Sequence, residues 1–213
     1  MWQSEHLGKA SFHGVENVVN FDLNATGGNQ GIVLSQPLTP QPWMFRVVDA
    51  GGERLPVIGD SYIRGNDFIA RLPQSERDDF GLTLQARFVR ETAAPLLLQW
   101  ITEMQTRLLD SHPAVLLQFD AQQYRPWAAG VDLFRHGDAH FSIMRSRRDQ
   151  AASRCEGAEQ NRLTYRLFGD FLEKGVIQKC TCWLAFWGQQ PPGDEQLQST
   201  FGYVCDAPLP LTT

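Results

Sequence analysis

Two histidines of this chain have a spacing that is found in metal sites. His136 and His140 are separated by three residues, and Asp138 between them could supply a third ligand. However, His136-Gly137-Asp138 has the composition of a turn, and metal-binding pairs at this spacing usually lie on a helix or bracket a loop supported by cysteines. We therefore favour a polar hairpin tip here, and we expect neither a metal ion nor another cofactor.

Carboxylates are the other residues that could do acid and base chemistry, for example on a sugar. An epimerase, a mutarotase or a hydrolase would need a carboxylate and a histidine, or two carboxylates, to converge in one concave site. The candidate catalytic residues are therefore His136, His140, Glu103, Asp67 and Asp132. For Glu103 the structural alternative is a solvent-facing partner for a lysine or arginine across a sheet.

The densest polar and aromatic cluster of the sequence surrounds Tyr62. Tyr62 and Arg64 would share one face of a strand, and Asn66 would lie at the following turn. Such side chains can bind vicinal hydroxyls while an aromatic ring stacks on the apolar face of a sugar. The structural alternative is that Asn66 serves only the turn and that Arg64 pairs with Asp60 or Asp67.

Trp127 is the best candidate for an exposed stacking residue in a loop. It follows Arg125 and Pro126 in a segment rich in turn residues, and loops on a rigid scaffold commonly carry binding residues. The alternative is a tryptophan that folds back to cover the core. The predicted ligand-binding residues are thus Tyr62, Arg64, Asn66 and Trp127.

Other signals of chemistry are weak or missing. Cys180 and Cys182 are at most half of a metal site, and they lie in the most apolar segment, where free cysteines behave as small buried hydrophobes. The sequence contains no G-x-S-x-G motif, no Walker loop and no dinucleotide fingerprint. These absences disfavour serine hydrolases and nucleotide-dependent enzymes.

The element that indicates the fold class most clearly is a strand expected over 176–187. Its side chains alternate for twelve residues without a glycine or proline, and both faces are apolar toward the C-terminal end. One face holds Val176, Gln178, Cys180, Cys182, Leu184 and Phe186, and the other holds Ile177, Lys179, Thr181, Trp183, Ala185 and Trp187. The pattern predicts a long strand that is nearly buried on both faces at that end.

The same alternation predicts strands along most of the chain. They are expected at 15–23, 31–35, 43–48, 54–58, 60–64, 67–72, 80–90, 95–109, 115–119, 131–135, 139–145, 162–168 and 199–205. The segment 95–109 also fits a helix with a stripe at Leu97, Trp100, Ile101, Met104 and Leu108, but the strand pattern is longer. Residues 49–52 are expected to form a hairpin turn, 121–130 a loop, and 146–161 a long loop or one helical turn. A frayed tail is expected around Pro208 and Pro210.

These elements predict an all-β protein: one domain over 1–213, built as a large antiparallel sandwich of two stacked, curved sheets with little helix. The net charge of −5 argues against nucleic acid as a partner. The basic residues Arg145, Arg147 and Arg148 are expected in a solvated loop. No signal peptide and no apolar run of about 20 residues is present, so we expect a cytoplasmic protein without a membrane partner.

The favoured function is a non-catalytic β-sandwich that binds a carbohydrate or a protein. The first alternative is the sugar-processing enzyme that uses a histidine and a carboxylate. The second alternative is a structural or assembly protein, an oligomer whose long strands pair between subunits.

Overall fold

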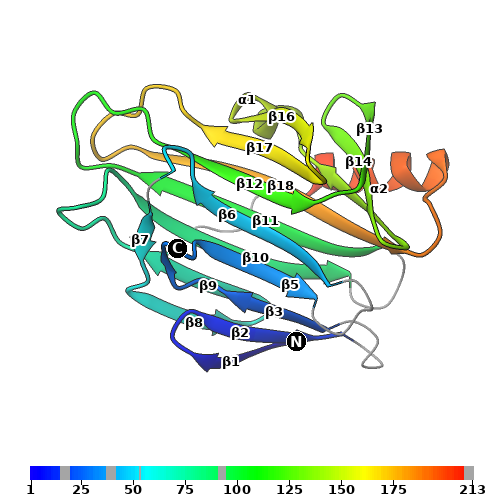
Figure 1. Cartoon of the computed structure of the whole chain (residues 1–213), viewed down its shortest axis with the longest axis horizontal. Helices are drawn as coiled ribbons and strands as arrows, with labels where there is room; N and C mark the ends of the chain where they lie inside the picture. Colours follow the sequence, from blue (N-terminus) through cyan, green and yellow to red (C-terminus); the bar gives the residue numbers. More distant parts are fainter. Residues whose placement is uncertain (15–19, 37–41, 53, 91–94, 209–213) are drawn as a thin grey trace.

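Two antiparallel sheets of eight strands pack face to face, and a third sheet has two short strands (Figure 1). This computed structural model describes residues 1–14, 20–36, 42–52, 54–90 and 95–208. The predicted all-β sandwich with little helix is confirmed. The first residues of the strand expected at 15–23 and the tail from 209 onward lie outside the described residues.

Sheet I holds both ends of its neighbour order far apart in the sequence. In spatial order its strands are β1 (Trp2–His6), β2 (Lys9–His13), β3 (Asn20–Asn24), β5 (Ile32–Gln36), β6 (Trp43–Asp49), β12 (Ala114–Asp120), β17 (Arg162–Phe168) and β16 (Ser153–Glu159). The small sheet pairs β4 (Gly27–Gly28) with β7 (Leu55–Val57).

Sheet II carries the long strands. In spatial order they are β13 (Gln123–Ala128), β14 (Val131–His136), β15 (Ala139–Met144), β18 (Ile177–Gly188), β11 (Leu96–Gln105), β10 (Gly81–Arg90), β9 (Asp67–Leu72) and β8 (Asp60–Arg64). The strand reading of 95–109 is therefore confirmed as β11, and the hairpin around Gly65 and Asn66 is confirmed as β8–β9.

The main core lies between the two sheets and follows the period of two. On β10, Leu82, Leu84, Ala86 and Phe88 all point inward, as the alternation predicts. Across the sandwich, the Phe45 ring contacts Trp100 and Phe119, each with 4.6 Å between ring centroids. The aromatic residues of the chain thus fill the space between the layers.

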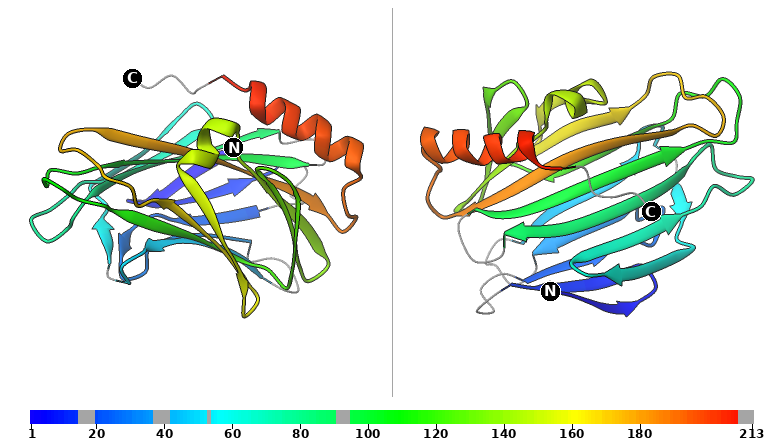
Figure 2. Two further views of the ribbon diagram at one scale, coloured as in Figure 1. Left: turned by 90° about the horizontal axis from the view of Figure 1, so that it is seen from above. Right: turned by 180° about the vertical axis from the view of Figure 1, so that it is seen from behind.

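A second apolar cluster explains why β18 is apolar on both faces. Trp183, Ala185 and Trp187 point away from the main core, and helix α2 (Asp194–Asp206) covers them with Leu197 and Val204. Figure 2 shows α2 lying across the outer face of sheet II. The predicted burial of both faces is confirmed, and its cause is this helix.

The strand expected over 199–205 is wrong, because these residues belong to α2. Leu197, Phe201 and Val204 recur at helical spacing and pack against sheet II, whereas Gly202 and Tyr203 between them stay exposed. The first residues of the helix had been assigned to a loop because of Pro191, Pro192 and Gly193, which in fact precede it.

Three other expectations are also corrected. The loop expected over 121–130 contains β13, an edge strand whose exposed residues show little alternation. The segment 146–161 contains α1 (Arg147–Ala151), as one of the two readings expected, but also edge strand β16. The turn at 49–52 joins no hairpin, since β6 pairs with β5 and β12 while β7 pairs with β4. The N-terminal strands β1 and β2 had not been anticipated.

Candidate functional site

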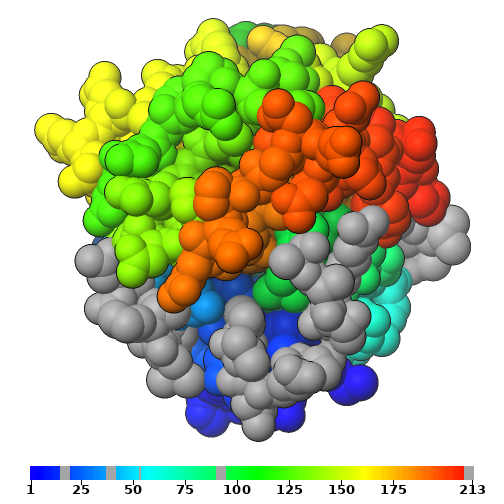
Figure 3. All heavy atoms as spheres, turned by 90° about the vertical axis from the view of Figure 1, so that its right-hand side faces the viewer, coloured from blue at the N-terminus to red at the C-terminus, as the bar shows by residue number. Residues whose placement is uncertain are grey.

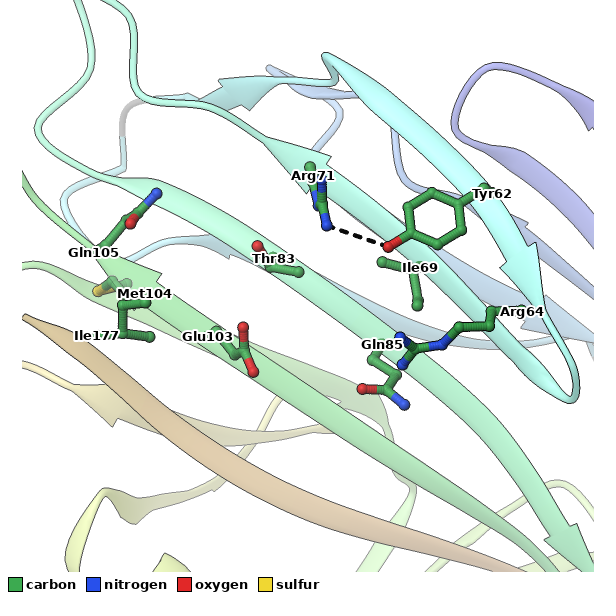
Figure 4. A pocket seen from close by; sticks show the side chains of 10 residues that line it. All are labelled: Tyr62, Arg64, Ile69, Arg71, Thr83, Gln85, Glu103, Met104, Gln105 and Ile177. Atoms are coloured by element: carbon green, nitrogen blue, oxygen red, sulfur yellow. Dashed lines mark hydrogen bonds between the residues drawn. The ribbon is translucent and has the colours of Figure 1, made fainter. Parts of the chain in front are cut away.

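A groove of about 260 Å³ lies on the outer face of sheet II, on the part of the face that carries β8, β9, β10, β11 and the start of β18. Its lining residues are Tyr62, Arg64, Ile69, Arg71, Thr83, Gln85, Glu103, Met104, Gln105 and Ile177 (Figure 4). Five strands therefore contribute to one site, and β10 runs along its middle.

Strand register brings these side chains to the same face. Paired residues of antiparallel strands point to the same side of a sheet. One row across the sheet consists of Asp60, Arg71, Thr83, Glu103 and Lys179, and the next consists of Tyr62, Ile69, Gln85, Ile101 and Thr181. The groove is thus a consequence of pairing among strands that are up to about a hundred residues apart.

The two sides of the groove differ in chemistry. On the β8–β9 side, Arg71 Nη2 donates to the Tyr62 hydroxyl at 3.2 Å, and its guanidinium carbon lies 5.6 Å from the ring centroid. On the β11 side, Lys179 Nζ donates to Glu103 Oε1 at 2.8 Å. The bland expectation for Glu103, a basic partner across the sheet, is confirmed by this pair.

Asp67 anchors the end of the groove from beneath. It is 2% exposed and accepts hydrogen bonds from Gln85 Nε2 at 2.9 Å, from Arg87 Nη2 at 2.7 Å and from Arg87 Nε. These bonds raise the pKa of Arg87. Because the amide nitrogen of Gln85 is held by Asp67, its carbonyl oxygen is the acceptor that Gln85 can offer to a ligand.

The structure brings some predicted binding residues together and leaves others apart. Tyr62 and Arg64 line the groove, and Arg64 Nη2 lies 4.0 Å from Asp67 Oδ2, as one alternative expected. Asn66 is exposed at the β8–β9 turn and does not line the groove.

Trp127 lies elsewhere on sheet II. Its indole Nε1 donates to Asp194 Oδ1 at 2.9 Å, and its ring packs against the second apolar cluster. Figure 3 shows α2 beside the β13–β14 segment on this side of the molecule. The contacts of Trp127 thus tie β13 to the first turn of α2.

The two candidate histidines point to opposite faces of sheet II. His136 pairs with Ala139 and His140 pairs with Arg135 across the β14–β15 hairpin. Since neighbouring residues of a strand alternate in direction, His136 shares a face with Ala139 and His140 with Arg135. Burial and the charge of Arg135 lower the pKa of His140. The sequence spacing of these histidines therefore does not translate into a shared ligand site.

Asp132 lies between the sheets, on the other side of sheet II from the groove. Its carboxylate accepts hydrogen bonds from Tyr165 at 2.6 Å, Tyr124 at 3.0 Å and Arg145 at 3.1 Å. Arg145 is 7% exposed, so the expectation of a solvated loop is wrong for this residue. Arg147 and Arg148 are exposed as expected. The candidate catalytic residues thus occupy separate regions: Glu103 in the groove, Asp67 beneath it, Asp132 inside the sandwich and the histidines on a hairpin.

Sequence reasoning missed most of the groove. Arg71, Thr83, Gln85 and Gln105 lie on strands that were predicted, on the face opposite the core positions. Their outward direction could be read from the alternation of β9 and β10. Their proximity to Glu103 could not, because it depends on the register of β10 against β11.

Comparisons with family models, curated proteins and solved structures found no match to this chain. Neither helix of the described residues is long and apolar enough to cross a membrane. Within the same residues, no group of three or more histidine, cysteine, aspartate or glutamate side chains is arranged to hold a metal ion.

Proposed function

We propose that this protein is a non-catalytic binding protein and that the groove on the outer face of sheet II binds a saccharide. The observation that carries the proposal is the combination of an aromatic ring with a continuous line of hydrogen-bonding side chains in one shallow site. Tyr62 supplies the ring, and Thr83, Gln85 and Gln105 supply donors and acceptors along β10 and β11. A volume of about 260 Å³ suits a ligand of sugar-ring size.

The two kinds of contact match the two kinds of surface on a sugar. The C–H face of a pyranose can pack on the Tyr62 ring and on Ile69 or Ile177, while its hydroxyls meet the polar side chains. Gln85 is held by Asp67, and Glu103 is held by Lys179. Because these groups are already oriented on rigid strands, little conformational entropy would be lost on binding.

The separation of the candidate acid and base residues supports binding over catalysis. Sheet II lies between Asp132 and the groove, and the β14–β15 hairpin that carries His136 and His140 contributes no residue to the groove lining. Glu103 remains in the groove, but its carboxylate is engaged by Lys179. A sugar-processing enzyme would need a second titratable group facing the same ligand.

The proposed compartment is the cytoplasm. All four cysteines are free, and Cys180 and Cys182 are buried among apolar side chains of the core. Unpaired cysteines suit a reducing compartment.

The test is a saccharide-binding screen of the parent and of Tyr62→Ala. We expect the parent to bind at least one saccharide of the array and Tyr62→Ala to bind it about tenfold or more weakly, because stacking on an aromatic ring contributes about 1–2 kcal/mol. Saturation-transfer NMR would show the ligand protons that contact the ring.

Phe171→Ala is the matched control, since Phe171 is an exposed aromatic residue that does not line the groove. A Trp127→Ala arm tests the other predicted stacking residue, and we expect it to retain binding. An array without any bound saccharide, or equal binding by the parent and Tyr62→Ala, would contradict the proposal.

A further inference from the structure

The charges around the groove are arranged unevenly. Each of its two best-ordered carboxylates has its own cation: Asp67 is bound by both Nη2 and Nε of Arg87, and Glu103 is bound by Lys179 at 2.8 Å. In such pairs the negative charge is largely compensated before any ligand arrives. The charge that the groove offers to a ligand is therefore set by the remaining side chains.

Those remaining side chains are cationic. The groove lining contains two arginines, Arg64 and Arg71, against the single carboxylate of Glu103. The hydrogen bond of Arg71 goes to a neutral partner, the Tyr62 hydroxyl. Asp60 is the cross-strand partner of Arg71, but it is exposed, so solvent screens its charge. The local field is thus positive on a chain whose net charge is −5.

The arginines also lie on one side. Figure 4 shows Arg64 and Arg71 on the β8–β9 side of the groove, with Glu103 and Gln105 on the β11 side. A ligand that lies across Thr83 and Gln85 would therefore face guanidinium groups at one edge. At its other edge it would face oxygen acceptors and an amide. Guanidinium groups bind carboxylates and sulfates through two parallel hydrogen bonds, whereas Glu103 accepts from hydroxyls and repels anions.

We infer that the saccharide bound in this groove is acidic, with its carboxylate or sulfate group at Arg71 and Arg64 and its hydroxyl groups toward Glu103. This inference rests on the proposed function, because it names the class of saccharide for the same site. It makes Arg71 the residue that determines specificity and makes Glu103 the residue that sets the orientation.

The ligands for the test are matched pairs that differ only in charge. Oligouronates of galacturonate, glucuronate and mannuronate are each compared with their neutral methyl esters, and a sulfated galactan is compared with the unsulfated polymer. Binding is measured by calorimetry at low and at physiological salt. We expect an acidic member to bind about tenfold or more tightly than its neutral match, with a preference that shrinks as salt rises.

Three variants assign that preference to Arg71. Arg71→Gln should lose most of the discrimination between acid and ester, and Arg71→Lys should retain part of it, because the charge stays and the fork geometry is lost. Tyr62→Phe removes the hydroxyl that Arg71 contacts and keeps the charge, so it should still prefer the acid. Arg162→Gln, an exposed arginine on sheet I, is the control and should bind like the parent.

The outcomes separate the two proposals. Equal binding of acids and their neutral matches would overturn the inference and leave the saccharide site standing. A preference for acids that persists unchanged in Arg71→Gln would overturn the assignment of the anion to this side of the groove. Absence of binding by every saccharide, acidic or neutral, would overturn the proposed function together with the inference that depends on it.

Discussion

Two buried aspartates show how environment decides the role of a residue. Asp67 and Asp132 are both nearly inaccessible, and each is bound by an arginine. Burial of a carboxylate is costly unless it is paired and hydrogen-bonded, and both residues meet that condition. Asp67 shapes the outer groove through Gln85, whereas Asp132 joins the two sheets through Tyr165.

The network around Asp132 predicts a loss of stability in alkali. Burial and the neighbouring carboxylate raise the pKa of Tyr165 well above its ordinary value of about 10. The native state therefore keeps a proton that the unfolded chain releases. Its stabilising contribution is complete below about pH 10 and falls as the pH rises toward the raised pKa. We expect Tyr165→Phe to make the free energy of unfolding less dependent on pH above that value.

Urea unfolding at several pH values between about 8 and 11 measures this slope. Some slope should remain in Tyr165→Phe, because burial and the contact with Cys155 also raise the pKa of Tyr124. Parallel pH profiles for the parent and Tyr165→Phe would count against the assignment.

At the level of elements, α2 explains the part of sheet II that is dry. Without it, the outer faces of Leu97, Trp183 and Trp187 would meet water, and the open groove would extend over an apolar surface. Trp127 and Asp194 fix the start of the helix to β13. The helix therefore divides the outer face of sheet II into a covered apolar part and an open polar part.

This role predicts unequal effects of two neighbouring residues on α2. Leu197 is fully buried against sheet II, and Gln198 is exposed. Leu197→Ala should lower the free energy of unfolding by about 2–4 kcal/mol, because it leaves a cavity in the second cluster. Gln198→Ala should change it by less than about 0.5 kcal/mol.

Denaturant unfolding followed by tryptophan fluorescence checks both values, since Trp183 and Trp187 lie beneath the helix. Similar losses for Leu197→Ala and Gln198→Ala would show that the helix contributes little through its packing.

At the scale of the whole molecule, the two sheets share one core. The main cluster includes Leu84 from sheet II and Leu117 from sheet I, and both are almost completely buried. Neither sheet can bury its inner face without the other. The organisation of the chain as a single domain, which the sequence predicts, implies that both sheets unfold together.

Leu84→Ala and Leu117→Ala test this prediction from opposite sides of the core. Each should lower the free energy of the same single unfolding transition by about 2–5 kcal/mol. Calorimetry and circular dichroism should give coincident transitions for each variant. Two separate transitions, each sensitive to only one of the two substitutions, would indicate two folding units.

Much of the fold could be predicted because its signals are local. The alternation in β10 and β18 and the turn residues Gly65 and Asn66 identify strands and a hairpin within short windows. The edge strands β13 and β16 were missed because one side of each is exposed, which leaves weak patterning. Helix α2 was missed because its buried stripe is narrow and follows a proline-rich segment.

The candidate site was predicted only in part. Tyr62, Arg64 and Glu103 were singled out for their chemistry, and all three line the groove. Arg71 and Gln85 were not, because nothing local distinguishes them from other outward polar residues of a sheet.

The sequence by itself determined the class of this protein: side chains alternate along an extended backbone, so a period of two specifies strands with an inner and an outer face. Only the tertiary structure decided which strands are neighbours, which aspartate faces the groove and which the core, and where a helix covers the sheet. The physical reason is that strand pairing and register join residues that are distant in the chain. Local patterns fix the direction of a side chain along its strand, whereas its neighbours on the sheet depend on the fold of the whole chain.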